Sequence, residues 1–193
     1  MKERVLIVLG HPALERQSFS EALVGAYQAG AHSAGNEVKI VSVARLSFDP
    51  ILHEGYCGDQ PPEPDLIDVQ EKIRWADHLV FIYPMWAYMI PALLKGFFER
   101  TFTRDFAYAA KSRNPLKAGL LDGKSARLIQ TMAMPSLIYR LFYQAHGAKA
   151  LKSMLKFCDI APVRITLFGT IDESDVRRKT YLDKTRALGK AGV

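Results

Sequence analysis

Five short strand-like runs alternate along the chain with longer segments of helical character. The runs, each apolar or alternating, cover Val5–Leu9, Glu37–Val43, Leu79–Tyr83, Lys124–Gln130 and Val163–Phe168. Helices are expected over residues 18–34, 65–76, 135–157 and 173–188, and one more begins at Pro91. Strands that alternate with helices in this way form parallel βαβ units with right-handed crossovers. The pattern predicts an α/β three-layer sandwich, folded as a single domain over residues 1–193.

The stretch around the third run carries the strongest pattern. Every position from Leu79 to Tyr83 is apolar, which is typical of a central parallel strand covered on both faces. An uncharged turn with Trp86 and Tyr88 follows, and Pro91 suits the first position of the next helix. Open α/β sheets bind ligands in loops at the carboxyl ends of their strands. Two aromatic residues without a charge therefore suggest a flat, apolar ligand held beside backbone amides.

The loop after the first run has two interpretations. It lacks the G-x-G-x-x-G pattern of dinucleotide sites and the G-x-x-x-x-G-K-[ST] pattern of P-loops. With His11 in the loop and Ser18 and Ser20 at the helix start, the amides and the dipole of that start can hold a phosphate. Alternatively, Ser18 and Glu21 form a capping box, and His11 is a hydrogen-bonded loop residue. The two roles are compatible.

Composition narrows the function classes. The 26 Lys and Arg outweigh the 20 Asp and Glu, which gives a net charge of +6, but these cations are dispersed and form no basic stripe. We therefore expect no nucleic-acid binding. No apolar run approaches the roughly 18 residues that cross a bilayer, and the chain enters its first strand without a signal peptide, so a cytoplasmic location is expected. Cys57 and Cys158 lie far apart without a C-x-x-C pair, which favours two reduced thiols over a zinc site or a disulfide.

Several further side chains are interpreted as structural. In the helix at 65–76, the candidates for burial are Ile67, Ile73 and Trp75. Lys95 and Arg100 are expected in solvent or at an interface rather than in catalysis. Residues 101–122 form a long connection. A loop of this length is usually functional, or its secondary structure has been wrongly assigned.

One long segment resembles a known family. YPMWAYMIPALLKGFFERTFTRDFAY, preceded by LGHP and SFS, resembles the flavodoxin-like NAD(P)H:quinone oxidoreductases. This family includes mammalian DT-diaphorase and the bacterial quinone reductases ancillary to potassium efflux systems. The similarity runs from Arg4 to Phe168, and its P-A-x-L-K-G-x-F-E-R motif is long and specific. The resemblance implies a five-stranded parallel sheet in the order 2-1-3-4-5, a homodimer and a tightly bound flavin.

Three loops would hold that flavin if the resemblance is carried over residue by residue. The loop around the flavin phosphate and ribityl chain is matched by His11, Ser18, Phe19 and Ser20. The turn along the isoalloxazine ring, with backbone amides near its N5 and O4 edge, is matched by Pro84, Met85, Trp86, Ala87 and Tyr88. The second flavin loop, after the fourth strand, is matched by Thr131, Met132, Ala133 and Met134.

Two departures from the family bear on the cofactor. Where some members have T-T-G-G, this chain has side chains at Ala133 and Met134, which limit how closely the backbone approaches the ring. The chain also lacks the long C-terminal extension of the mammalian enzymes. That difference favours FMN over FAD without deciding between them.

The implied chemistry is hydride transfer from NAD(P)H to flavin N5 and then to a quinone or a similar planar acceptor. One pocket used twice predicts ping-pong kinetics. In the family a tyrosine and a histidine beyond the second flavin loop assist the reduced flavin. Tyr139 matches this tyrosine, and His146 is the nearest histidine, although it lies one residue further on than in the mammalian pattern.

Two groups of aromatic residues have both a functional and a structural interpretation. On one helix over 135–157, interrupted at most near Gly147, Tyr139, Tyr143 and His146 would share a face, and the alternative is helix packing. Phe106 and Tyr108 match residues that wall the acceptor pocket from the partner subunit. Without the family, these two side chains could equally belong to the core.

Two other functions stay open. A one-electron carrier of the flavodoxin type would need no substrate pocket, but such carriers usually present an acidic face, unlike this chain of net charge +6. The second alternative is a regulatory subunit that senses redox state, associated peripherally with a membrane transporter.

Overall fold

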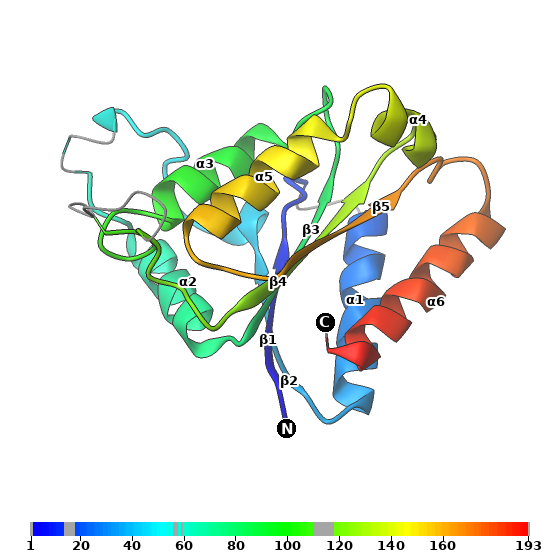
Figure 1. Cartoon of the computed structure of the whole chain (residues 1–193), viewed down its shortest axis with the longest axis horizontal. Coiled ribbons are helices and arrows are strands. Elements are labelled where there is room, and N and C mark those ends of the chain that lie inside the picture. The colour runs from blue at the N-terminus through cyan, green and yellow to red at the C-terminus, as the bar shows by residue number, and fades with distance from the viewer. Residues whose placement is uncertain (1, 14–17, 56–57, 59, 110–117, 193) are drawn as a thin grey trace.

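The computed structural model describes residues 2–13, 18–55, 58, 60–109 and 118–192, and it has three layers (Figure 1). The five parallel strands are β1 (Arg4–Leu9), β2 (Glu37–Ser42), β3 (His78–Pro84), β4 (Ser125–Thr131) and β5 (Val163–Phe168). They lie in the order β2-β1-β3-β4-β5, which confirms the flavodoxin-like α/β fold expected from the sequence. Each strand boundary lies within one residue of its predicted position.

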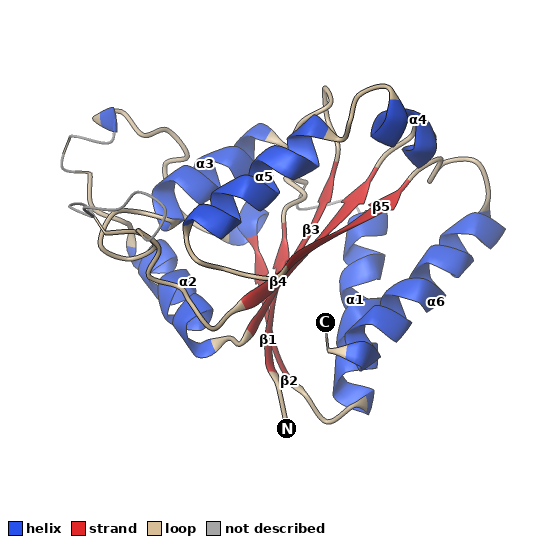
Figure 2. Cartoon of the chain, in the orientation of Figure 1, coloured by secondary structure: helices blue, strands red, loops and turns tan. Residues whose placement is uncertain are grey.

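The helices cover both faces of the sheet (Figure 2). One face is covered by α1 (Phe19–Ser33) and α6 (Asp175–Ala191), and the other by α2 (Pro64–Trp75), α3 (Ala92–Thr101) and α5 (His146–Phe157). A 3-10 turn, η1 (Val43–Arg45), follows β2, and the short helix α4 (Ser136–Leu141) lies beyond the end of β4. All seven residues of β3 are buried because this central strand is covered on both sides.

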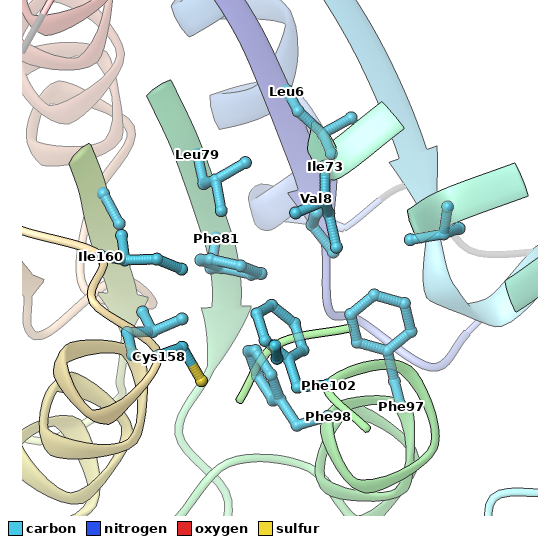
Figure 3. Packing of buried hydrophobic residues seen from close by; sticks show 14 of the residues in the cluster. Leu6, Val8, Ile73, Leu79, Phe81, Phe97, Phe98, Phe102, Cys158 and Ile160 are labelled. Atoms are coloured by element: carbon cyan, nitrogen blue, oxygen red, sulfur yellow. The ribbon is translucent and has the colours of Figure 1, made fainter. Parts of the chain in front are cut away.

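The larger hydrophobic cluster lies beneath α2, α3 and α5 (Figure 3). Phe98 of α3 contacts Phe81 of β3 and Phe102, with ring centroids 5.1 and 5.3 Å apart. Phe106 continues this chain of rings and is only 6% exposed. Phe102 and Phe106 therefore belong to the hydrophobic core of this chain. Part of the 101–122 connection, residues 110–117, lies outside the described residues.

On the opposite face, α1 and α6 approach each other at two glycines. A Cβ atom at Gly30 would lie 2.0 Å from the Arg186 carbonyl oxygen, and one at Gly189 would lie 2.2 Å from that of Tyr27. Only a hydrogen atom fits at either position, so the two backbones are in direct contact. The helix α6 is thereby fixed against α1.

Two expectations about helices are wrong. Residues 135–157 form two helices, because Gln144 and Ala145 adopt left-handed φ values of 49° and 51°. The break therefore precedes Gly147. In α2, Ile73 is buried as expected and Trp75 partly so, but Ile67 is 47% exposed.

The expected location of Arg100 is also wrong, because its side chain is 1% exposed. It forms an ion pair with Glu63 at 2.9 Å and donates to three backbone carbonyls between Asp49 and Pro61. A guanidinium offers five N–H donors in a fixed plane, so one side chain can satisfy all of these acceptors. Arg100 therefore ties the long excursion before α2 to α3.

Two further sequence expectations concern the cysteines and the membrane. Cys57 lies outside the described residues, and Cys158 is buried as a free thiol. Within the described part of the chain, no helix has the length and apolar character to span a bilayer.

Candidate functional site

Three loops meet at the carboxyl edge of the sheet, after β1, β3 and β4. The ring of His11, after β1, contacts that of Trp86, after β3, with centroids 5.8 Å apart. The amide of Met85 donates to the Thr131 carbonyl at 2.7 Å, which joins the second loop to the third. Because β1 and β3 are neighbours that are not consecutive, this edge is a topological switch point, where such sheets bind ligands. The three loops matched by the resemblance thus lie together at one edge of the sheet.

The turn after β3 is tight and strained. Trp86 and Met89 exchange two backbone hydrogen bonds of 3.0 and 2.9 Å, and the central residues Ala87 and Tyr88 have φ values of 46° and 65°. Such a turn, with two positive φ angles, normally contains asparagine or glycine. Two L-residues with side chains are held here in a sparsely populated conformation, which is most often found at functional sites.

The strained turn exposes both aromatic faces and backbone donors. Trp86 and Tyr88 are each 48% exposed. Among the described residues, no group accepts a hydrogen bond from the amides of Ala87 or Tyr88. Two adjacent donors beside exposed rings suit a planar ligand with acceptor atoms on one edge.

The corner between α4 and α5 holds this turn from behind. Tyr139 is fully buried, and its hydroxyl donates to the Tyr88 carbonyl at 3.4 Å. The ring of Tyr143 packs at a tilt against the Tyr88 ring, and the hydrogen bond between their hydroxyls raises the pKa of Tyr88. Gly147 allows α5 to approach, since a Cβ there would lie 2.6 Å from the Tyr88 carbonyl oxygen. Three residues after β4 thus support the conformation of the turn after β3.

In the first loop, a hydrogen bond to the His11 ring indicates which of its nitrogens carries the proton. The Ala13 amide donates to His11 Nδ1 at 3.1 Å. A nitrogen that accepts a hydrogen bond carries no proton, so the neutral ring has its proton on Nε2. In this tautomer Nε2 of His11 is a hydrogen-bond donor, and the ring contacts Trp86.

The start of α1 confirms the capping interpretation of Ser18. Its side chain accepts from the Glu21 amide at 3.2 Å. Ser20 is buried, and Phe19 is partly buried. The guanidinium of Arg178, from α6, lies 5.8 Å from the Phe19 ring, which adds a cation near the positive end of the α1 dipole. No local pattern indicated Arg178, because only the packing of α6 on α1 brings its side chain close to Phe19.

The third loop is fixed by the connection between β5 and α6. The Thr170 amide donates to the Met134 carbonyl at 3.1 Å, and the Met132 amide donates to the Phe168 carbonyl at 2.8 Å. Met132 is buried against Tyr139, whereas Ala133 is exposed toward solvent. The loop therefore retains an exposed backbone position at Ala133 even though it lacks the glycines of T-T-G-G.

The two residues expected beyond this loop occupy different places. Tyr139 belongs to α4 and contacts the turn, whereas His146 is the exposed first residue of α5. Because the chain turns between the two helices, Tyr139, Tyr143 and His146 do not share one helix face, and that expectation is wrong.

A cavity of about 750 Å³ lies between α3 and α5, beside the turn. Its apolar lining includes Trp86, Met89, Tyr108 and Phe157, but not Phe106. Cys158 also lines it, and burial raises the pKa of this thiol to about 12, so it is not a reactive nucleophile. Tyr108 thus lines this cavity, whereas Phe106 lies in the core, and their role in an acceptor pocket shared with a partner stays a prediction.

Comparison with known proteins agrees with this geometry. The Flavodoxin_2 profile, described as a Flavodoxin-like fold, matches residues 3–189. The chain belongs to the Flavodoxin_2 family. The crystal structure of Smu.1420 from Streptococcus mutans UA159 is 33% identical to this Flavodoxin_2 chain, with a TM-score of 0.82 over 97% of this chain and 99% of the other. An NAD(P)H:quinone oxidoreductase from Methanothermobacter marburgensis, 24% identical, shares the fold with a TM-score of 0.78 over 98% of this chain and 96% of the other.

Sequence relatives of this Flavodoxin_2 chain are described as oxidoreductases. An uncharacterized NAD(P)H oxidoreductase from Haemophilus influenzae is 29% identical over 185 residues, which cover 92% of this chain and 90% of the relative. NAD(P)H dehydrogenase (quinone) 1 from Cavia porcellus is 34% identical over 125 residues, 54% of this chain. That match spans 45% of the guinea-pig protein. The homologues thus include enzymes of the NAD(P)H:quinone oxidoreductase type.

Proposed function

We propose that this chain is a flavin-dependent NAD(P)H oxidoreductase that acts on quinones or similar planar two-electron acceptors. FMN is the first candidate for the cofactor, and FAD is the alternative. The observation that carries the proposal is the strained Trp86–Met89 turn, which presents two adjacent amide donors and two exposed rings at the switch point of the sheet. A Bacillus anthracis azoreductase of the same fold, described in complex with FMN, supports this choice of cofactor.

The residues at the three loops fit a flavin. The phosphate and ribityl end would be held at the start of α1 by His11, Ser18, Phe19 and Ser20. The ring would lie along Pro84, Met85, Trp86, Ala87 and Tyr88, with Thr131, Met132, Ala133 and Met134 at its other side. When bound, the flavin supplies the acceptance and return of a hydride.

The chain's own residues would orient the planar ligands and exclude water. Trp86 and Tyr88 offer apolar ring faces on which a nicotinamide or a quinone can stack. The amides of Ala87 and Tyr88 would act as fixed dipoles toward a ring edge that becomes more negative. Tyr139 would act as a positioning residue, because its hydroxyl contacts the turn. His146 stays a candidate catalytic residue. The variant His146→Ala tests this role, and the measurement is the rate of acceptor reduction.

We also propose a homodimer, as the resemblance implies. The apolar cavity between α3 and α5, lined by Tyr108, would lie where a second copy completes the acceptor pocket. Light scattering would measure the molar mass, and a monomer at working concentration would contradict this assembly.

The visible spectrum of the purified protein tests the main proposal. A yellow protein that releases FMN on heating, identified by mass, is the expected result. NADH or NADPH alone should bleach the bound flavin, and a small quinone should restore its colour. A one-electron carrier would instead need a separate reductase. A colourless protein that binds neither added FMN nor added FAD would contradict the proposal.

Two variants connect this test to the turn. Ala87→Pro should abolish flavin binding, because proline requires φ near −65° whereas Ala87 has φ of 46°. Ala87→Gly should bind flavin at least as well as the wild type, since glycine adopts positive φ readily. If both variants bind flavin equally well, the turn is not part of the flavin site.

A further inference from the structure

Exposed apolar side chains form a stripe on α4. Leu137, Leu141 and Phe142 are 63%, 64% and 79% exposed, and Ile138 is 41% exposed. Helix residues four apart share a face, so these side chains are contiguous, and we call them the α4 patch. Tyr139 of the same helix is fully buried and fixes α4 to the molecule. Large apolar patches on soluble proteins usually mark an interaction surface.

The segment around the α4 patch is basic and contains no acid. Residues 132–158, which follow β4, include four Lys and Arg and no Asp or Glu. Arg140 and Lys149 are exposed, and Lys152 and Lys156 follow along α5. None of these four cations forms an ion pair with another described residue.

The other surface helices differ in this respect. On each of α2, α3 and α6, a lysine pairs with a carboxylate four residues away along the helix. The α4–α5 segment has no acid that could play this part. Its positive charge is therefore left to attract an external anionic partner.

We propose that the α4 patch docks on the surface of an anionic lipid bilayer. Leu137, Leu141 and Phe142 would enter the boundary between headgroups and acyl chains, while Arg140 and Lys149 contact the headgroups. Apolar side chains flanked by cations are the combination that binds such interfaces, and each cation adds to the attraction. No described helix can span the membrane, so the attachment is peripheral.

A second copy of the chain is the rival occupant of the patch. A two-fold contact centred here would place identical surfaces face to face. The acid-free segment of one copy would then lie against the same segment of the other, and like charges would oppose the contact. The charge distribution therefore favours the anionic bilayer over self-association through this patch.

Docking would also place the candidate site at the membrane. Tyr143 follows the α4 patch directly and packs against Tyr88, so the patch continues into the exposed rim of the turn. A quinone dissolved in the bilayer would then reach the rim without crossing water. This consequence depends on the proposed oxidoreductase function, whereas docking itself does not.

Flotation with lipid vesicles tests the proposal with the full-length protein. Vesicles of phosphatidylcholine alone are compared with vesicles that contain about one third phosphatidylglycerol. The protein should float with the anionic vesicles, float much less with the neutral ones, and be released at high salt. A protein that stays in the buffer with both kinds of vesicle would overturn the proposal.

Matched variants locate the surface. Phe142→Ser should weaken binding to anionic vesicles about tenfold, because it removes one large apolar contact. Val176→Ser is the control, since Val176 is 77% exposed on α6 and lies outside the patch. For charge, Arg140→Gln with Lys149→Gln should weaken binding, whereas Lys179→Gln should not.

Two outcomes would count against the α4 patch. If Phe142→Ser and Val176→Ser lose binding to anionic vesicles equally, the α4 patch is not the contact with the membrane. A fall in molar mass of Phe142→Ser, measured by light scattering, would assign the patch to a contact between copies. Leu141→Ser provides a second variant, and circular dichroism checks that each variant is folded.

Discussion

The ring of Tyr143 packs against the ring of Tyr88, with centroids 4.6 Å apart and planes inclined by 32°. Their hydroxyl oxygens lie 3.4 Å apart. One ring belongs to the strained turn after β3, and the other to the corner between α4 and α5. The contact therefore couples the conformation of the candidate flavin site to the segment that follows β4.

Loss of this ring contact should loosen the turn. Tyr143→Ala is expected to raise the dissociation constant for FMN about three- to tenfold, because aromatic pairs contribute about 0.5–1.5 kcal/mol beyond their buried area. Tyr143→Phe keeps the ring and should retain near wild-type affinity. Fluorescence titration of the flavin-free protein measures both. If the alanine and phenylalanine variants bind alike, the ring contact does not support the site.

A methyl group at Gly147 should disturb the same turn. Its Cβ would lie 2.6 Å from the Tyr88 carbonyl oxygen and 3.2 Å from the Tyr139 hydroxyl, so α5 or the turn must move. We expect Gly147→Ala to lower the free energy of unfolding by about 1–3 kcal/mol and to weaken FMN binding. Gly25→Ala is the control, because a Cβ at Gly25 meets no atom within 4 Å and should be neutral or stabilising. Urea unfolding compares the two variants.

Replacement of Arg100 should be far more costly than replacement of an exposed lysine on the same helix. Arg100→Met would leave Glu63 and three carbonyls without their donor, and we expect a loss of about 3 kcal/mol in the free energy of unfolding. Lys95→Met removes an exposed pair with Glu99 and should change stability by no more than about 1 kcal/mol. Similar urea midpoints for both variants would contradict the buried role of Arg100.

The buried His78 should make stability depend on pH. Burial, together with the charges of Arg127 and Arg164, lowers the pKa of His78 from 6.5 to about 4. Between these values the unfolded chain binds a proton that the folded chain excludes. Stability should therefore fall as the pH drops from 6.5 towards 4, by up to about 1.4 kcal/mol per pH unit.

The variant His78→Gln isolates this contribution. Its stability should depend less on pH in the same window than that of the wild type, and urea unfolding at several pH values measures the difference. Ser125→Ala removes the hydroxyl that lies 2.6 Å from His78 Nδ1 but keeps the histidine, so the slope should persist. An unchanged slope in His78→Gln would show that His78 does not titrate as inferred.

The strands β1 and β3 were predictable because buried parallel strands are apolar runs, and β2 was predictable from its alternation; both signals are local. The turn after β3 was also predictable from its aromatic residues, but its left-handed geometry was not, because Ala87 and Tyr88 are not residues that favour positive φ. The break between α4 and α5 at Gln144 and Ala145 was missed for the same reason, because neither residue type favours positive φ.

Other features depend on contacts between distant segments. Arg100 is buried only because the excursion before α2 brings carbonyls to it, and Arg178 reaches Phe19 only because α6 packs on α1. No local pattern encodes such approaches. A long cation in a helix is exposed in most proteins, so the general expectation was wrong for Arg100.

The close contact between α1 and α6 has a consequence for synthesis on the ribosome. Translation makes α1 well before α6, so the Gly30 side of α1 has no partner while the intervening chain is synthesised. Until the residues around Gly189 leave the exit tunnel, this face of the sheet keeps apolar surface in contact with water. The packing of α6 on α1 therefore forms only after the residues around Gly189 have left the ribosome.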